Sequence, residues 1–240
     1  MKIGLIGYGK MGKAIEAIAL ERGHSIAFTV NSERSISAVS LADADVAIEF
    51  SQPALAPVHI RACIAAGLPV VVGTTAWQEH LASIKALVAE QHGSLLYASN
   101  FSVGVNLLFQ LNERMAQLFA TQPDYTASIE EIHHVQKLDA PSGTAVTLAD
   151  GILANNSTYS TWICGEGQAP EPAPHALSIT AIREPEVPGT HHVRYTSEID
   201  TLTLTHEAHS RKGFAQGAVI AAEFLHGKTG LFTMRDVLAL

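Results

Sequence analysis

Cysteine is scarce in this sequence. Only Cys63 and Cys164 occur in 240 residues, and they are far apart, without a C-x-x-C spacing. A disulfide framework or a zinc finger needs more cysteines or closer ones, so the sequence indicates neither. This usage is typical of a reducing compartment, and we expect a cytoplasmic protein.

Long apolar runs and an excess of positive charge are also missing. No segment approaches the roughly 18 apolar residues of a membrane-spanning helix, and Lys10 and Lys13 interrupt the one N-terminal stretch that resembles a signal peptide. Lys and Arg number 15 against 23 Asp and Glu, which gives a formal net charge of −8. We therefore expect neither nucleic acid nor a membrane as a partner, and an anionic ligand must find local positive charge.

The rest of the composition is that of a globular protein. Hydrophobic residues make up 47% and charged residues 16%, and the length suits one large domain or two modest ones. Histidine is the exception, because there are 12 of them, including the adjacent pairs His133–His134 and His191–His192. This enrichment is the first indication of chemistry.

The first hundred residues alternate between short apolar runs and helical patterns. The apolar runs cover residues 3–6, 24–30, 45–50, 68–73 and 94–99. Between them, residues 53–66 and 77–92 have the pattern of helices, with Ser51 as the expected N-cap of the first. Such alternation predicts βαβ units and a mostly parallel sheet, and the nearly uniform apolar runs predict helices on both of its faces.

The alternation of short apolar runs and helical patterns ends after about residue 106. A helix over residues 107–118 leads to a run at 125–134, and a loop then opens a helix that reaches about residue 153. Three alternating runs at 176–184, 191–199 and 201–208 predict an antiparallel or mixed sheet, with the Pro- and Gly-rich residues 165–175 as a loop. Helices are expected again at 214–226 and after Thr233, whose spacing to Asp236 suits a capping box.

Together these patterns predict an α/β protein of two domains. A Rossmann-type, dinucleotide-binding domain is expected over residues 1–103 and 209–240, because the C-terminal helices should pack back on the first sheet. A second α+β domain with a mixed or antiparallel sheet is expected over residues 104–208.

A glycine motif stands at the junction of the first strand and helix. Gly7, Gly9 and Gly12 form G-x-G-x-x-G, at the place where a dinucleotide diphosphate meets free N–H groups and the positive end of a helix. The alternative is a glycine-rich turn needed only for close packing of helix on strand.

The end of the second strand bears on cofactor choice. An acidic residue that would bind the ribose of NAD is missing there, and Asn31, Ser32 and Arg34 occupy the segment. These side chains suit a ribose hydroxyl or a 2′-phosphate, so NADPH is favoured or at least tolerated. The alternative for Arg34 is an exposed loop charge without a ligand.

The most informative stretch runs from residue 130 to residue 145. It brings together His133, His134, Lys137 and a helix entry at Ser142–Thr144. A cationic lysine and a helix N-terminus both suit a carboxylate, and a histidine can donate a proton near neutral pH. The stretch therefore predicts an anion-binding site with a proton donor.

Two other readings of these histidines remain open. Each could be a core or surface residue with a satisfied hydrogen bond, although the nearby lysine makes this less favourable. A zinc site is the second reading, and its possible ligands are Glu130, Glu131, His133, His134, His191, His192, His206 and His209. No H-E-x-x-H or comparable spacing is present, so the anion site is favoured.

The motifs resemble those of the bacterial 4-hydroxy-tetrahydrodipicolinate reductases, also called dihydrodipicolinate reductases, of the diaminopimelate and lysine pathway. The resemblance covers nearly the whole chain, and its longest motif is highly specific. It is carried by GYGKMG at 7–12, GTT at 73–75, SNFSVGVN at 99–106, EIHHVQKLDAPSGTA at 131–145 and GFAQGA at 213–218.

The resemblance implies a reduction of a small cyclic imine with two carboxylates by hydride from NADPH or NADH. It also makes residues 104–208 the substrate-binding and oligomerisation domain, with a homotetramer built through the second sheet. It makes His133 the catalytic acid/base and Lys137 its cationic partner. The substrate carboxylates are expected at His134, Ser142, Gly143 and Thr144. The cofactor is expected at Gly7, Gly9, Lys10, Met11, Gly12, Asn31, Ser32, Arg34, Gly73, Thr74, Thr75, Ser99, Asn100 and Phe101.

Two departures from the family pattern and two rival functions remain. Asn31 replaces the acid after the second strand, which leaves the cofactor preference open, and Gln136 stands where many relatives carry a basic residue. The rivals are a non-enzymatic NAD(H)-sensing Rossmann module and a metal-dependent hydrolase that uses the histidine pairs.

Overall fold

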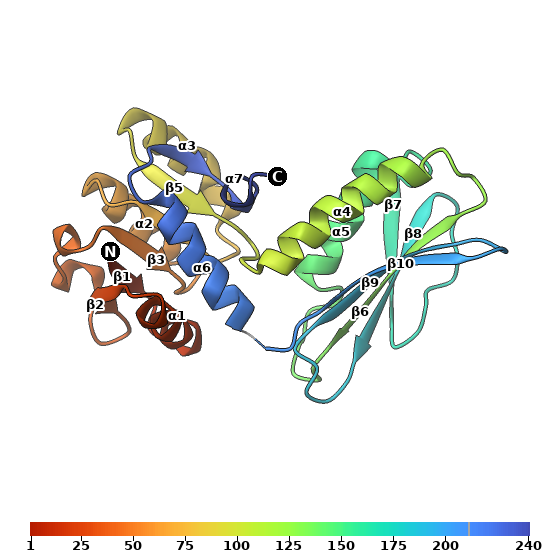
Figure 1. Cartoon of the computed structure of the whole chain (residues 1–240), viewed down its shortest axis with the longest axis horizontal. Helices are drawn as coiled ribbons and strands as arrows, with labels where there is room; N and C mark the ends of the chain where they lie inside the picture. The colour runs from red at the N-terminus through yellow and green to blue at the C-terminus, as the bar shows by residue number, and fades with distance from the viewer. Residues whose placement is uncertain (211) are drawn as a thin grey trace. The chain divides into compact units, whose positions relative to one another are not determined.

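The structure, a computed structural model, describes residues 1–210 and 212–240 (Figure 1). The chain divides into two compact units. Unit 1 consists of residues 1–103 and 212–240, and unit 2 of residues 104–211. Among the described residues, no helix is both long and apolar enough to cross a membrane.

Unit 1 is built on a six-stranded sheet in which all neighbouring strands are parallel. The strand order is β11-β5-β4-β3-β1-β2. The strands are β1 (Lys2–Ile6), β2 (Ser25–Val30), β3 (Val46–Glu49), β4 (Val70–Val72), β5 (Ser94–Tyr97) and β11 (Gly230–Phe232). Every residue of the central strands β3 and β4 is buried, as the uniformly apolar runs predict.

Helices cover both faces of this sheet. One apolar core joins the sheet to α1 (Lys10–Glu21), α6 (Lys212–Leu225) and α7 (Met234–Leu238), and a second joins it to α2 (Ala56–Ala65) and α3 (Leu81–Glu90). Each buried Val, Leu or Ile side chain contributes about 1.5–3 kcal/mol, so the two cores hold the strands rigidly. The expected Rossmann-type arrangement is confirmed.

Three details of unit 1 differ from expectation. Helix α2 begins at Ala56 with Leu55 as N-cap, so the expected capping by Ser51 is wrong. Ser51 instead donates its hydroxyl hydrogen to the buried carboxylate of Glu49. The residues before α3 form a 3₁₀ turn, η3 (Gln78–His80), and two others, η1 (Ile36–Ala38) and η2 (Leu41–Asp43), follow β2.

The C-terminal end of unit 1 follows its sequence signals in part. The expected capping box of α7 is present, because the backbone N–H of Thr233 donates to Asp236 Oδ2 at 2.7 Å. Strand β11 was not expected, since three residues are too few to show an alternating pattern.

Unit 2 contains a five-stranded mixed sheet in the order β10-β9-β6-β8-β7. Strand β6 is parallel to β8 and antiparallel to β9, β8 is parallel to β7, and β9 is antiparallel to β10. The strands are β6 (Thr126–His133), β7 (Thr161–Glu166), β8 (Ala176–Arg183), β9 (Thr190–Thr196) and β10 (Thr201–Glu207). Strand β7 was not expected, and it takes Gly165 and Glu166 from the expected loop.

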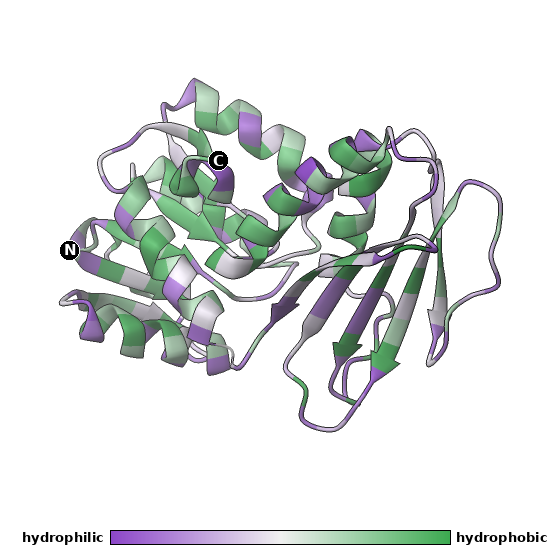
Figure 2. Ribbon diagram, turned by 45° about the vertical axis from the view of Figure 1, so that its right-hand side comes forward, coloured by the Kyte–Doolittle hydropathy of each residue, from purple (hydrophilic) through white to green (hydrophobic). Residues whose placement is uncertain are grey.

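Two helices pack on one face of this sheet. These are α4 (Val103–Phe119) and α5 (Gly143–Asn155), and they share a core with the inward side chains of β6, β8 and β9. Buried and less buried residues alternate along β6 and β8, and Figure 2 shows the same alternation of hydrophobic and hydrophilic residues along the strands. This period of two places His133 and Glu131 on one side of β6 and Glu130 on the other.

Candidate active site

The glycine loop of unit 1 has no room for a side chain at Gly7 and Gly12 but has room for one at Gly9. Gly7 has a φ of +94°, and a Cβ there would lie 2.0 Å from the carbonyl oxygen of Phe50. A Cβ on Gly12 would lie 2.3 Å from the carbonyl oxygen of Gly7. No described atom lies within 4 Å of a Cβ on Gly9. The loop therefore packs tightly against β3 and α1 but leaves room for a ligand at Gly9.

Gly9 is also the N-cap of α1. No side chain of the described residues caps this helix, and its first turn holds no acidic residue but does hold Lys10. Its first N–H groups therefore face the open side of the loop, where the helix dipole and Lys10 favour an anion. This cradle fits the diphosphate of a dinucleotide.

The segment after β2 forms a turn held by Asn31. Asn31 Oδ1 accepts hydrogen bonds from the backbone N–H of Glu33 at 2.9 Å and of Arg34 at 2.8 Å. The turn leaves Ser32 and Arg34 exposed. The side-chain oxygen of Asn31 thus shapes the turn, while Ser32 and Arg34 carry the groups that can meet a ligand.

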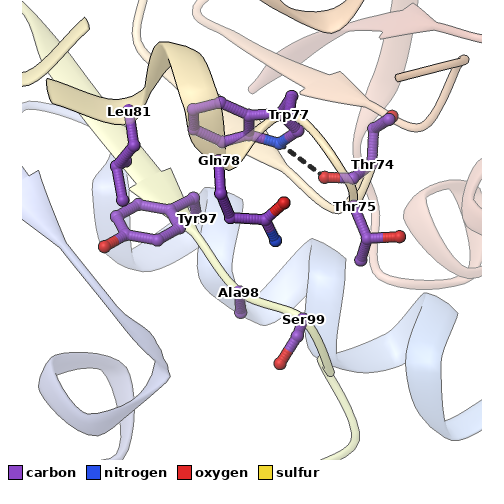
Figure 3. Close-up of a pocket in the computed structure, with 8 residues that line it drawn as sticks. All are labelled: Thr74, Thr75, Trp77, Gln78, Leu81, Tyr97, Ala98 and Ser99. Atoms are coloured by element: carbon purple, nitrogen blue, oxygen red, sulfur yellow. Dashed lines mark hydrogen bonds between the residues drawn. The ribbon is translucent and has the colours of Figure 1, made fainter. Parts of the chain in front are cut away.

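The GTT motif follows β4 and lies between two hollows of unit 1. One, of about 250 Å³, is lined by Met11, Phe50, Ser51, Pro53, Gly73, Thr74 and Thr75. The other, of about 230 Å³, is lined by Thr74, Thr75, Trp77, Gln78, Leu81, Tyr97, Ala98 and Ser99 (Figure 3). The carbonyl oxygen of Thr74 accepts from Trp77 Nε1 at 2.7 Å, and Thr74 Oγ1 accepts from the backbone N–H of Ser51 at 2.8 Å. These bonds fix the loop between the hollows.

Residues 99–101, which the sequence places at the cofactor, lie in three different environments. Ser99 lines a hollow, and Asn100 Oδ1 accepts from the backbone N–H of Ser102 at 2.9 Å. Phe101 is buried, with its ring centroid 5.6 Å from that of Phe50. Its side chain therefore belongs to the core beneath the site.

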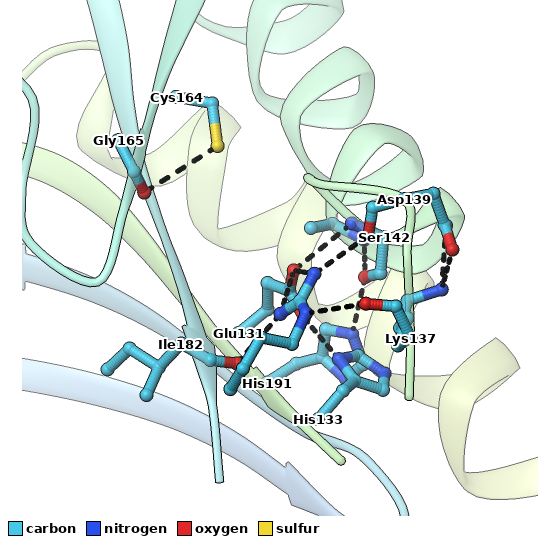
Figure 4. A network of polar contacts seen from close by, with 11 residues as sticks. Glu131, His133, Lys137, Asp139, Ser142, Cys164, Gly165, Ile182 and His191 are labelled. Carbon is cyan, nitrogen blue, oxygen red and sulfur yellow. Dashed lines mark hydrogen bonds and ion pairs between the residues drawn. The ribbon is translucent and has the colours of Figure 1, made fainter. Parts of the chain in front are cut away.

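In unit 2, His133 ends strand β6 and is bound to a buried carboxylate. His133 Nδ1 makes a short hydrogen bond with Glu131 Oε2. Glu131 is fully buried, and its Oε1 accepts from Arg183 at 3.0 Å and from the backbone N–H of Ser142 at 3.2 Å (Figure 4). Burial opposes ionisation, but the bonds and charges of His133 and Arg183 outweigh it and hold the pKa of Glu131 below its usual value.

Lys137 lies in the loop that follows. Its ammonium group contacts both carboxylate oxygens of Asp139, at 2.8 and 2.6 Å. Arg183 also donates to the carbonyl oxygens of Lys137, at 3.3 Å, and of Asp139, at 2.7 Å. The loop carrying the lysine is therefore tied to the same arginine that binds Glu131.

The start of α5 borders this network. Ser142 is the N-cap, and its hydroxyl oxygen accepts from the backbone N–H of Ala145 at 3.2 Å. Gly143 is exposed, and no described atom lies within 4 Å of a Cβ there. The positive end of this helix is thus open beside Lys137 and His133, as an anion site requires.

The two histidines of the second pair, His191 and His192, point to opposite faces of the sheet. His191 is buried, lies 3.1 Å from Ser142 Oγ through its Nε2, and places its ring 5.1 Å from that of His133. His192 points to the other face, where its Nδ1 lies 2.9 Å from Thr205 Oγ1. Only His191 belongs to the site.

His191 is expected to make the protein less stable in acid. Burial, followed by the charge of His133, lowers its pKa from 6.5 to about 3. Between these values the unfolded chain binds a proton that the folded chain does not, so the free energy of unfolding falls as pH falls, by about 1.4 kcal/mol per pH unit. In urea titrations between pH 7.5 and 5, His191→Gln should reduce this slope. His226→Gln, at an exposed position, is the control, and an unchanged slope in His191→Gln would contradict the assignment.

The sequence did not reveal all members of the network. The sequence indicates Glu131 only as a possible metal ligand and gives no local signal for Arg183. Arg183 lies at the end of β8, paired with His133 across the sheet, and only the register of the two strands could have shown this. His191 was visible as one of a pair, but its side of β9 depended on that strand's limits.

The donor atoms at this place do not fit a metal ion well. Glu131, His133 and His191 have ligand atoms within 4.8 Å of one another. Both oxygens of Glu131, however, already accept hydrogen bonds, one of them from the cationic Arg183. A guanidinium on the same carboxylate would repel a divalent cation. The arrangement instead suits an anion beside a proton donor.

A parallel sheet with a glycine loop, joined to a unit with a histidine–lysine cluster, is typical of dinucleotide-dependent oxidoreductases. The family model described as "Dihydrodipicolinate reductase, N-terminus" matches residues 1–101, and "Dihydrodipicolinate reductase, C-terminus" matches residues 104–238. The chain belongs to the dihydrodipicolinate reductase family, whose members are also named 4-hydroxy-tetrahydrodipicolinate reductases.

Individual relatives agree with this membership. The chain is 46% identical to the 4-hydroxy-tetrahydrodipicolinate reductase of Christiangramia forsetii, over 100% of this chain and 98% of the relative. It is 38% identical to that of Akkermansia muciniphila, over 97% and 95%. A dipicolinate-bound dihydrodipicolinate reductase from Paenisporosarcina sp. has the same fold, with a TM-score of 0.77, 21% identity and 97% of each chain covered. The resemblance inferred from the motifs is confirmed, which counts against the sensor and the hydrolase.

Proposed function

We propose that this chain reduces 4-hydroxy-tetrahydrodipicolinate to tetrahydrodipicolinate with NADPH or NADH, in lysine and diaminopimelate biosynthesis. Unit 1 holds the cofactor and unit 2 holds the substrate. The observation that carries the second assignment is the cluster of His133, Lys137 and the open start of α5 within one unit. The family's own name supports the choice of substrate.

The cofactor fits unit 1 at four places along the carboxyl ends of its parallel strands. The open N-terminus of α1 with Lys10 and Met11 suits the diphosphate, and the turn at 31–34 suits the ribose end. The two hollows beside the GTT motif and Ser99 suit the nicotinamide end. When bound, the reduced nicotinamide supplies a hydride. The chain's own task there is to hold and orient the dinucleotide.

The substrate's two carboxylates require positive charge in a protein whose net charge is −8. Lys137 and the N-terminal end of α5 at Gly143 and Thr144 supply it locally, whereas the backbone N–H of Ser142 donates to Glu131 and only its hydroxyl group can meet the substrate. His134 follows directly after β6. Asp139 holds the ammonium group of Lys137 at 2.6 Å, so a substrate carboxylate must share or replace that contact.

His133 is the proton donor in this proposal. The reaction adds a hydride and a proton to the substrate and releases its 4-hydroxyl group as water. An imidazolium is an N–H acid that can donate this proton to the substrate. Nδ1 is occupied by Glu131, which leaves Nε2 as the donating atom.

The activity is tested with the condensation product of pyruvate and aspartate semialdehyde. We expect consumption of NADPH or NADH that depends on this substrate and is unchanged by a chelator. Cofactor binding without substrate-dependent turnover would support the sensor instead, and loss of turnover with the chelator would support the metal-dependent enzyme.

Thr144 is expected to contribute to substrate affinity more than to turnover. A carboxylate contact at the start of α5 is made in both the ground and the transition state, so Thr144→Val should mainly raise KM. Thr147→Val is the control, since Thr147 lies on the same helix but donates its hydroxyl hydrogen to the Gly143 carbonyl oxygen at 3.0 Å. A fall in kcat alone would mean that the Thr144 contact forms only in the transition state.

We further propose a homotetramer built through the sheet of unit 2. Helices α4 and α5 cover one face of this sheet, and near its β9–β10 end the apolar side chains of Ile199 and Leu202 are exposed. Burial of such residues in an assembly removes them from water. Sedimentation equilibrium should give four times the mass of 25.5 kDa, and a monomer at assay concentration would contradict this assembly.

A further inference from the structure

The proposed reaction assigns no role to the carboxylate of Glu131 in unit 2. It is fully buried, and each of its contacts is made inside the protein. Burying a charged group is costly unless it is paired, and Glu131 is paired with Arg183 on one oxygen and His133 on the other. Such a carboxylate is well placed to control the ring of His133.

The bond to Glu131 decides which nitrogen of His133 is available. An ionised carboxylate only accepts hydrogen bonds, so Nδ1 must carry a hydrogen, and the neutral ring must present Nε2 as its basic atom. The same bond prevents rotation of the ring, because the Glu131 side chain is itself held by Arg183 and by the backbone N–H of Ser142.

The backbone just before β9 passes close to Nε2. A Cβ on Gly189 would lie 2.9 Å from His133 Nε2, closer than carbon atoms approach a nitrogen without displacement. The backbone at Gly189 is fixed, because its carbonyl oxygen accepts from the N–H of Ala208 at 2.9 Å. A side chain at this position would therefore cover the reactive nitrogen, and glycine avoids this.

We propose that Glu131 and Arg183 are positioning residues for His133: Glu131 fixes the ring with Nε2 as the proton-donating atom, and Arg183 fixes Glu131. Gly189 completes the arrangement, because a side chain there would cover Nε2. This inference rests on the proposed role of His133. Glu131 acts through the imidazole and does not touch the substrate, so its removal affects turnover and its pH dependence.

The other charged or titratable groups around the ring are few in the described part of the chain. His191 from β9 stacks edge-on against it, and burial keeps His191 neutral near pH 7. Arg183 comes from β8, His134 follows His133, and Lys137 lies in the following loop with its charge paired to Asp139. Glu131 is thus the carboxylate in direct contact with His133, and it favours the imidazolium that the reaction needs.

The first test is Glu131→Gln. The amide oxygen can still accept from Arg183 and Ser142, but the NH₂ group then faces Nδ1 and reverses the tautomer. We expect kcat to fall by about 10²–10⁴-fold, as when other catalytic histidines lose their carboxylate, with an unchanged Kd for NADPH. The alkaline limb of the kcat–pH profile should move to lower pH, because the imidazolium loses its anionic partner.

Glu130→Gln is the matched control. Glu130 is the preceding residue on the other face of β6, and it pairs with Arg194 at 2.9 Å. The same chemical change there breaks a Glu–Arg ion pair of the same strand without touching His133. Glu130→Gln should leave kcat and its pH profile unchanged, and equal losses in the two variants would overturn the proposal.

The variants His133→Ala and Glu131→Gln together distinguish a failure of this inference from a failure of the proposed function. If His133→Ala retains its turnover, the proposed function of His133 fails. If His133→Ala is inactive and Glu131→Gln keeps the wild-type kcat and pH profile, only the positioning role fails. In the His133→Ala background, Glu131→Gln should lower kcat no further, because Glu131 acts through the ring.

The unaltered chain offers a test that does not depend on a variant folding. In ¹⁵N NMR spectra, the neutral form of His133 should carry its hydrogen on Nδ1, and the opposite tautomer would overturn the proposal.

The role of Gly189 has its own test. Gly189→Ala should lower kcat because its Cβ covers Nε2, whereas Gly167→Ala should not. Gly167 also has a positive φ, +74°, but no described atom lies within 4 Å of a Cβ there. Wild-type kcat in Gly189→Ala would contradict the access argument.

Discussion

Replacement of His133 by alanine is expected to lower kcat by about 10²–10⁴-fold while the affinity for NADPH stays unchanged. The imidazole is the group of unit 2 that can donate a proton near neutral pH and is held by a buried carboxylate. The residues proposed to bind the cofactor lie in unit 1, so the loss should appear in turnover and spare dinucleotide binding. Steady-state kinetics and calorimetric titration of NADPH measure the two quantities.

Lys137→Ala should have an effect of similar size for a different reason. The ammonium group offsets substrate charge that a negatively charged protein otherwise repels. Lys228→Ala provides a control, because Lys228 belongs to unit 1, where its ammonium group lies over the ring of Phe224. Wild-type turnover in both the His133 and the Lys137 variants would refute the assignment of this site.

Arg34→Ala is expected to weaken NADPH binding selectively, by up to about a hundredfold, and to leave NADH nearly unaffected. A charge-assisted hydrogen bond is worth about 1.5–3 kcal/mol, which is the origin of this figure. The turn held by Asn31 exposes the Arg34 side chain beside the end of β2, where the ribose of a dinucleotide is expected. Equal losses for the two cofactors would mean that Arg34 is an exposed charge without contact to the 2′-phosphate.

Asn31→Asp tests the same preference in the opposite direction. The aspartate retains an oxygen to accept from the N–H groups of Glu33 and Arg34, so the turn should persist. The added negative charge repels a 2′-phosphate and can bind an unphosphorylated ribose, so the preference should move toward NADH. Calorimetric titration of both cofactors into the wild type and the two variants decides the matter. A strong NADH preference in the wild type would show that Asn31 and Ser32 bind the ribose without an acid.

Local signals in the sequence were sufficient for the strands β1 to β5 of unit 1, but not for β11. The strands β1 to β5 are short, mostly apolar and bounded by glycine or turn residues, and each run could be recognised without knowing its neighbours. The Gly7–Gly12 motif was readable because steric exclusion of a Cβ at Gly7 and Gly12 is a local demand of the strand–turn–helix. The capping box at Thr233 is local in the same sense.

Errors arose where the local pattern was short or competed with a distant contact. Ser51 has the residue type of an N-cap, but the buried Glu49 binds its hydroxyl, and the helix begins later. Strand β7 at Thr161–Glu166 lies at the edge of the sheet, has an exposed residue at each end and shows no alternation of buried and exposed residues. Its pairing with β8 defines it as a strand.

The sequence alone determined the residue types of the candidate site and the family, because His133, Lys137 and Ser142–Thr144 are close in the chain. The tertiary structure alone decided how the histidine is held. Arg183 and His191 come from β8 and β9, about fifty residues downstream, and they reach Glu131 and Ser142 only through the register of the mixed sheet. Strand register depends on pairing between segments distant in sequence, and local residue patterns carry no record of it.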